Sequence, residues 1–96
     1  TEADRRNWRE ESLLTEAVYR TLRACWNTAR FLLAREAGRP EDMRRAAADE
    51  RENALAAVPV YEQAPWLEFN LRTDGYYSKA GDMIREKIRM IAEFLR

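Results

Sequence analysis

The stretch that decides the fold is residues 5–37, RRNWREESLLTEAVYRTLRACWNTARFLLAREA, which contains neither Gly nor Pro. Small and apolar residues recur along it at steps of four, four, three, four and three: Leu14, Val18, Leu22, Cys25, Ala29 and Leu32. Trp26 and Leu33 widen this stripe on one side, which is typical of a helix packed in a bundle. The spacing predicts one helix, roughly 50 Å long, that buries the stripe.

A second helix is expected to begin at Pro40, after a turn at Gly38. Gly suits a left-handed helix C-cap, and Pro fits the first turn of the following helix. Glu41 and Asp42 would lie at the positive end of its dipole. Pro59 is expected to close this helix. Its predicted stripe consists of Met43, Ala47, Glu50, Ala54 and Val58.

Residues 59–77 hold two Pro, one Gly and five aromatic residues, and they predict an ordered loop. Alternation at Leu67, Phe69 and Leu71 allows a short extended stretch with no strand to pair with, and residues 73–75 predict a turn. A third helix should start near Lys79 or Asp82 with Ser78 as a possible N-cap. Its predicted buried stripe is Ile84, Ile88, Ile91 and Leu95.

The pattern as a whole predicts an all-α fold over residues 1–96. We expect one helical domain, a bundle-like array of three helices with a long first helix, an antiparallel second helix and a third packed on both. The shorter helices cannot cover a 50 Å partner along its full length. Among the first twelve residues only Ala3 and Trp8 are apolar, so this end should fray, project or rest on protein outside the chain.

Composition excludes several classes of function. The 96 residues carry 17 basic and 17 acidic side chains, no His and one Cys, and they show no basic face for nucleic acid. The chain lacks the residues that form ordinary zinc sites and Ser-His or Cys-His catalytic groups, and no stretch has the ligand pattern of a calcium loop. No metal and no cofactor is therefore expected. Cys25 should behave as a small buried hydrophobe. No apolar run approaches the length of a membrane span.

The N-terminal residues 1–6 resemble neither an initiation site nor a secretion signal. The chain therefore looks like a trimmed piece of a longer protein. The absence of a signal peptide from these residues favours a cytoplasmic location.

Glu50 is the residue that most resembles a catalytic group, because an ionised carboxylate on an apolar stripe requires compensation. Two interpretations are open: a general acid, or a structural partner of Arg30, Arg20 or Lys87. We favour the structural partner, because buried ion-pair networks perturb carboxylates as active sites do.

The aromatic side chains of the loop also allow two interpretations. Trp66, Phe69, Tyr76 and Tyr77 are suited to stacking against a sugar, which makes carbohydrate a candidate ligand. They are equally suited to anchoring a long loop on the helices, and we favour this second role because an ordered loop of nineteen residues must bury side chains.

Five segments together resemble the C-terminal helical region of large bacterial glycoside hydrolase-like proteins: residues 49–54 (DERENA), 57–62 (AVPVYE), 66–67, 76–77 and 83–88 (MIREKI). The likeness spans roughly residues 22–95. The positions that match the family pattern are Trp26 and Arg30, then Glu50, Asn53 and Ala54, then Tyr76 or Tyr77, and finally Lys87 with Ile88. Where the family commonly has an Asp-Ser-Arg-Leu-Gly-like loop, this chain has residues 64–68, APWLE.

The resemblance implies a non-catalytic helical accessory module that packs against the catalytic domain of a carbohydrate-active protein. No catalytic residue transfers to this chain, since the catalytic carboxylates would belong to an upstream barrel. The alternative is a stand-alone interaction or homodimerisation module with Trp8 and the exposed end of the first helix as its seam. An enzyme acting through Glu50 ranks third. Residues expected to contact a ligand or a neighbouring domain are Trp8, Glu50, Asn53, Trp66, Tyr76 and Tyr77.

Overall fold

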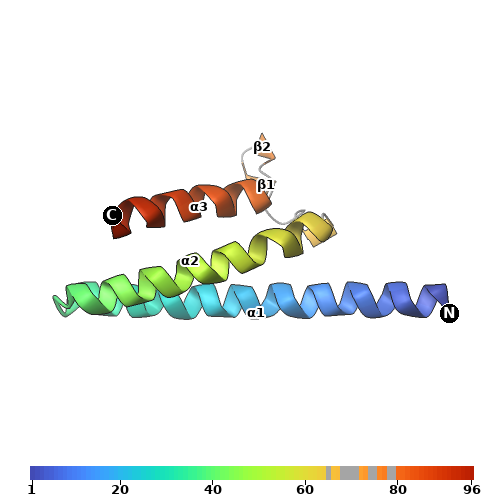
Figure 1. Cartoon of the computed structure of the whole chain (residues 1–96), viewed down its shortest axis with the longest axis horizontal. Coiled ribbons are helices and arrows are strands. Elements are labelled where there is room, and N and C mark those ends of the chain that lie inside the picture. The colour runs from blue at the N-terminus through green and yellow to red at the C-terminus, as the bar shows by residue number, and fades with distance from the viewer. Residues whose placement is uncertain (65, 68–71, 74–75, 78–79) are drawn as a thin grey trace.

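The computed structural model of the chain contains three helices arranged side by side with α2 in the middle (Figure 1). The helices are α1 (Glu2–Glu36), α2 (Pro40–Gln63) and α3 (Ala80–Leu95), and a hairpin of two-residue strands, β1 (Arg72–Thr73) and β2 (Tyr76–Tyr77), precedes α3. The structure describes residues 1–64, 66–67, 72–73, 76–77 and 80–96, without the side chains of 72–73, 76–77 and 80. The predicted all-α fold with a long first helix is confirmed.

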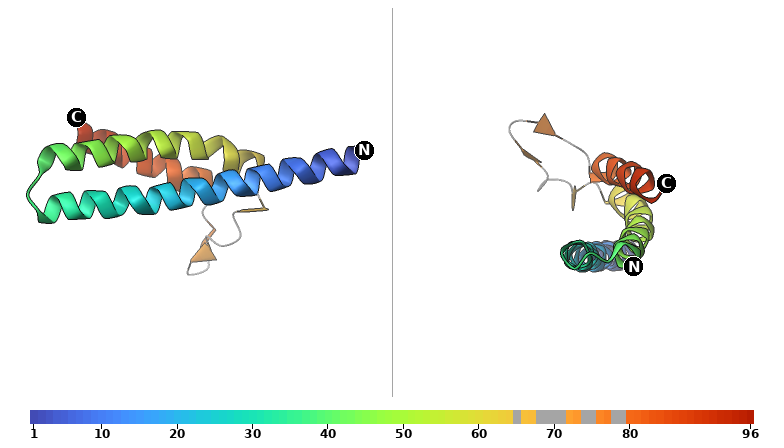
Figure 2. Two further views of the ribbon diagram at one scale, coloured as in Figure 1. Left: turned by 90° about the horizontal axis from the view of Figure 1, so that it is seen from below. Right: turned by 90° about the vertical axis from the view of Figure 1, so that its left-hand side faces the viewer.

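Helix α1 starts earlier than predicted, because a capping box closes its N-terminus. The backbone N–H of Asp4 donates to the Thr1 hydroxyl at 3.1 Å, and the Asp4 carboxylate accepts from the Thr1 amino group. Every residue from 1 to 12 is exposed, and this end of α1 extends beyond α2 (Figures 1 and 2). This end is helical and does not fray, and within the described chain it projects; its contact with protein outside the chain stays a prediction.

The turn between α1 and α2 follows the predicted chemistry. Gly38 has φ of 67°, and its N–H donates to the Arg35 carbonyl at 3.1 Å, while the Arg39 N–H donates to the Ala34 carbonyl at 2.9 Å. This pair of bonds is a Schellman motif, which requires a left-handed residue where Gly is least strained. Pro40 then occupies the first turn of α2, as expected.

The prediction that Pro59 closes the second helix is wrong, because α2 continues through Pro59 to Gln63. Pro59 cannot donate to the carbonyl of Leu55, but both residues are exposed, so water can satisfy that carbonyl. The extra turn is retained because Val60 and Ala64 are buried beyond the proline. Burial outweighs the local penalty of the ring.

Helix α3 begins at Ala80, within the predicted range, and runs antiparallel to α2. Three polar contacts fasten it along its length: Arg85 to Glu62, Lys87 to Glu50, and Arg44 to the carbonyl of Leu95 at 2.7 Å. The predicted stripe of Ile84, Ile88, Ile91 and Leu95 is half-buried. The suggested N-cap Ser78 and most of the predicted extended stretch lie outside the described residues.

Helix α3 packs mainly on α2 and much less on α1. This corrects the expectation that the third helix packs on both of the others. Viewed end-on, α2 separates α1 from α3 and leaves the array open on one side (Figure 2). Between α1 and α3, the rings of Phe31 and Phe94 meet edge to face with centroids 5.3 Å apart. The molecule is accordingly elongated, with a radius of gyration of 15.6 Å, compared with about 13 Å for a compact domain of this length.

The interior contains small and polar side chains. The buried apolar residues are Ala17, Ala34, Ala46, Ala47, Ala54, Ala57, Val60 and Ala64, and the largest fully buried side chain is Asn27. Small residues allow the helix backbones to approach closely, but each buried methyl contributes only about 0.8 kcal/mol. Polar contacts must therefore supply much of the specificity between α1 and α2.

The face that α1 turns toward α2 differs from the predicted one. The buried and half-buried residues follow steps of four and three along a second stripe: Leu13, Ala17, Arg20, Ala24, Asn27, Phe31 and Ala34. The apolar stripe that was expected to be buried is exposed instead, as Leu22 at 65% illustrates. Among the described residues, no helix is long and apolar enough to span a membrane.

We predict that Pro59→Ala stabilises the protein. The substitution restores one helical hydrogen bond and removes the ring from an exposed position, and we expect a gain of about 1–2 kcal/mol in the free energy of unfolding, less the entropy that Pro removes from the unfolded chain. Urea unfolding followed by circular dichroism measures the change. Arg51→Ala, another exposed position of α2, is the control and should change stability little. A destabilised Pro59→Ala variant would show that the proline itself favours the observed path of α2.

Candidate interaction surface

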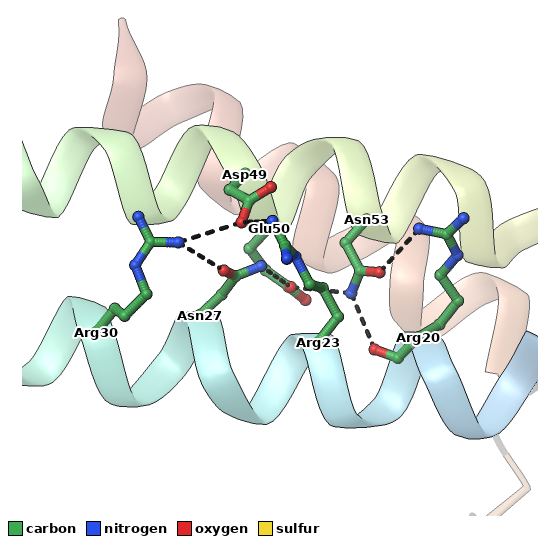
Figure 3. A network of polar contacts seen from close by, with 7 residues as sticks. All are labelled: Arg20, Arg23, Asn27, Arg30, Asp49, Glu50 and Asn53. Carbon is green, nitrogen blue, oxygen red and sulfur yellow. Dashed lines mark hydrogen bonds and ion pairs between the residues drawn. The ribbon is translucent and has the colours of Figure 1, made fainter.

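Glu50 lies at the centre of a buried polar network that joins all three helices, and Figure 3 shows the part between α1 and α2. One carboxylate oxygen accepts from the side-chain amides of Asn27 on α1 and Asn53 on α2, each at 3.0 Å. The other oxygen pairs with the ammonium group of Lys87 on α3. Asn27, Glu50 and Asn53 are 1%, 6% and 4% exposed, so these bonds are shielded from water.

The asparagine amides extend the network toward arginine side chains of α1. Asn53 also donates to the backbone carbonyl of Arg20 at 3.0 Å and accepts from its guanidinium at 3.3 Å. At the other end, Arg30 donates to the side-chain oxygen of Asn27 and to Asp49, both at 3.2 Å. Helix α1 is therefore held to α2 by hydrogen bonds that require particular side chains at particular positions along the two helix axes.

Asp49 forms the outer edge of the network, where it accepts from Arg23 at 2.5 Å and from Arg30. The hydrogen bond and charge of Asp49 raise the pKa of the Arg23 guanidinium above its usual value. These side chains are partly exposed, and such pairs contribute little by themselves. Their contribution is orientation, because they restrict how α1 can rotate against α2.

The geometry supports the structural interpretation of Glu50. Both of its oxygens are already bonded, and its cation is Lys87, one of the three partners considered from the sequence. Arg20 and Arg30 instead bind the neighbouring Asn53, Asn27 and Asp49. Within the described residues, every buried side-chain polar atom has a partner.

An apolar groove runs between α1 and α3, with α2 as its floor. It has two adjoining parts of about 530 and 400 Å³ that share Thr28, Leu32, Glu50 and Lys87. Small side chains of α2 form the floor: Ala46, Ala47, Ala54 and Ala57. Met83 and Met90 of α3 stand in the wall and are 48% and 59% exposed. Methionine walls adapt readily to different apolar partners.

The rim of this groove carries few charges. Glu86 is the acidic residue of the α3 wall, and hydrogen bonds from Arg89, at 2.6 to 3.1 Å, lower the pKa of its carboxyl. The same hydrogen bonds raise the pKa of Arg89. Glu86 is thereby neutralised by a neighbour on its own helix, and the groove presents a mainly apolar surface.

A second apolar surface, the outer face of α1, is the exposed stripe described above together with its flanking side chains. It comprises Leu14, Val18, Tyr19, Leu22, Cys25, Trp26, Ala29, Leu32 and Leu33, all of them exposed. Cys25 was expected to be buried, and its exposure is a correction that follows from the rotation of α1. Cys25, Ala29 and Leu32 stand at the border between this face and the groove.

The other predicted contact residues with described side chains, Trp8 and Trp66, take no part in the polar network around Glu50 and Asn53. Trp8 is 72% exposed on the projecting end of α1, and Trp66 is 45% exposed after α2. Tyr76 and Tyr77 lie in β2, but their side chains are outside the described residues. Over residues 1–64, 66–67 and 80–96, no group of three or more Cys, Asp and Glu side chains is placed to bind a metal ion.

Comparison with known proteins identifies no relative of this chain. No protein-family model matches it, and neither the curated proteins nor the solved structures include a significantly similar chain. The function must therefore be inferred from the residues and their geometry.

Sequence reasoning identified Glu50 and Asn53 but missed Asn27, Asp49 and Arg23. A usable signal existed, because Asn27 falls at helical spacing with the small residues Ala17, Ala24 and Ala34. A buried Asn requires a polar partner, and Glu50 on the predicted stripe of the second helix was such a partner. The stronger apolar pattern of the opposite face concealed this second stripe.

We predict that Asn53→Ala destabilises the protein by about 1–3 kcal/mol, because it removes one of the two amide donors to a Glu50 oxygen and both contacts of Asn53 with Arg20 in a shielded site. Chemical unfolding measures the loss. Glu52→Ala changes the exposed neighbouring position on α2 and should stay within about 0.5 kcal/mol of the parent. Equal stability of the two variants would show that the network is not buried.

Proposed function

We propose that the chain is a non-catalytic helical accessory module of a larger carbohydrate-active protein, and that it packs against the catalytic domain of that protein through the groove between α1 and α3. The groove is the observation on which this proposal rests. In a four-helix bundle, the position above α2 and between α1 and α3 would be filled by a fourth helix. Here that position is an open apolar channel.

The chemistry of the groove suits a helix from another domain. The alanine floor lets a backbone approach α2 closely, and the walls offer apolar side chains such as Ile84, Leu32 and Met90. An amphipathic helix binds such a channel with anchors spaced three and four residues apart. The isolated module has an interior of small side chains, so covering the groove would also add apolar burial that the chain cannot supply.

The link to carbohydrate-active proteins rests on the resemblance of residues 49–54 and 83–88 to the accessory region of glycoside hydrolase-like proteins. Four of the matching residues take part in one network: Arg30, Glu50, Asn53 and Lys87. Their mutual bonding supports a scaffold role, in which the matching motif preserves the packing of three helices. A catalytic carboxylate would instead need access to substrate, whereas Glu50 is 6% exposed.

The proposal predicts that the natural gene encodes a longer protein in which the groove is covered. Hydrogen–deuterium exchange compares α3 in the full-length protein with α3 in the 96-residue chain, and we expect at least tenfold slower exchange in the former, because docking opposes local opening. Met90→Glu should remove this difference, since it places a charge in the groove, whereas Glu93→Ala on the same helix should preserve it.

Two results would contradict this function. One is an open reading frame that begins immediately before Thr1 and ends after Arg96. The other is equal exchange rates of α3 in a longer gene product and in the isolated chain.

A further inference from the structure

The outer face of α1 is uncharged over five helical turns. Its residues occur at steps of three or four from Leu14 to Leu33, and the charged residues of the same segment lie on the side of α1 that faces α2, as Arg20, Arg23 and Arg30 do. Soluble monomers rarely expose a contiguous apolar patch of more than a few hundred Å². Something of matching chemistry is therefore expected to cover it.

The size of the face matches an interface between two proteins. Leu14, Val18, Tyr19, Leu22, Trp26, Leu32 and Leu33 are 46%, 50%, 50%, 65%, 59%, 44% and 71% exposed. Scaled by the size of each residue, these fractions amount to roughly 800 Å², the area that one partner contributes to an interface of standard size. Trp and Tyr are also the residues that most often dominate binding energy.

We propose that the outer face of α1 binds a second copy of this chain in an antiparallel, two-fold symmetric pair of α1 helices. From Val18 to Leu32 the steps are four, three, four and three, the a/d repeat of helices that pack side by side. A second copy presents the same uncharged face, so the pairing buries no unpaired charge. The surface adjoins the groove, with which it shares Cys25, Ala29 and Leu32, and extends beyond it at Leu14, Val18 and Leu22. The proposal does not depend on the accessory function.

Residue sizes favour the antiparallel orientation. In an antiparallel pair each a position faces a d position, which places Leu22 opposite Cys25 of the second copy and Val18 opposite Ala29 of the second copy. Both of these central levels then join a larger side chain to a smaller one, so the helix spacing stays even there. A parallel pair would instead set Ala29 against Ala29 and Leu32 against Leu32, leaving a gap beside a bulge.

The same register gives Trp8 a role. Opposed residue numbers add to 47 in this arrangement, so Trp8 of one copy reaches the level of Arg39 in the second copy. The projecting end of α1, exposed in the single chain, would then lie beside the turn at Gly38. Trp8 would thus extend the seam instead of forming its centre, which Leu22 and Cys25 occupy.

Cysteine crosslinking tests both the contact and its direction. In the antiparallel register the two Cys25 residues are about 4.5 Å apart along the axis, whereas two Thr15 residues are roughly 25 Å apart. Cys25 is the only Cys of the chain, so a short bismaleimide should convert the 96-residue protein to a covalent dimer. The variant with Cys25→Ser and Thr15→Cys should remain uncrosslinked. Crosslinking at both positions, or at neither, would overturn the proposal.

Sedimentation equilibrium compares the parent chain with matched variants of the outer face and of the groove. The parent chain should sediment as a dimer whose dissociation follows mass action, and Leu22→Glu should weaken dimerisation by roughly thirtyfold or more. Met90→Glu places the same charge in the groove and should leave the dimer intact. Circular dichroism confirms that both variants keep their helix content. A monomeric parent chain, or equal loss of dimer in both variants, would contradict the assignment of this face.

Discussion

The carboxylate of Glu50 is the group on which the arrangement of the three helices depends. It is buried and charged, and it accepts from Asn27 on α1, Asn53 on α2 and Lys87 on α3. A buried charge is costly unless it is bonded, so the helices are held at the rotation that supplies those donors. The network thereby selects which face of α1 meets α2, and the selected face is the polar one.

The two apolar surfaces follow from that selection. Because Asn27 and the alanines of α1 turn inward, Leu22, Trp26 and Leu33 turn outward, and α3 rests on α2 without closing over α1. The chain keeps a specific but weakly apolar interior and exposes large apolar side chains. This distribution favours roles in assembly, through the groove for a neighbouring domain and through the outer face for a second copy.

The local structure could be predicted from the sequence, whereas the way the helices pack was predicted less well. The helix type and the turn at Gly38 and Pro40 were predicted, because capping and periodicity are local rules. For Glu50 the sequence left three cationic partners open, of which the structure shows Lys87. The inward face of α1 was not, because periodicity tells which residues share a face and not what that face meets. The prediction that the second helix ends at Pro59 was wrong for a related reason. The burial of Val60 and Ala64 is a tertiary effect that local helix propensity does not include.

The measurement that tests the central claim most directly is a double-mutant cycle between Asn27→Ala and Glu50→Ala in chemical unfolding. If Asn27 faces α2 and bonds to Glu50, the two free-energy changes should fall short of additivity by about 1–3 kcal/mol, as residues in one network do. If the apolar stripe of α1 faces inward instead, Asn27 lies in solvent far from Glu50. The two substitutions would then be additive within about 0.5 kcal/mol, and the central role of Glu50 in orienting α1 would be contradicted.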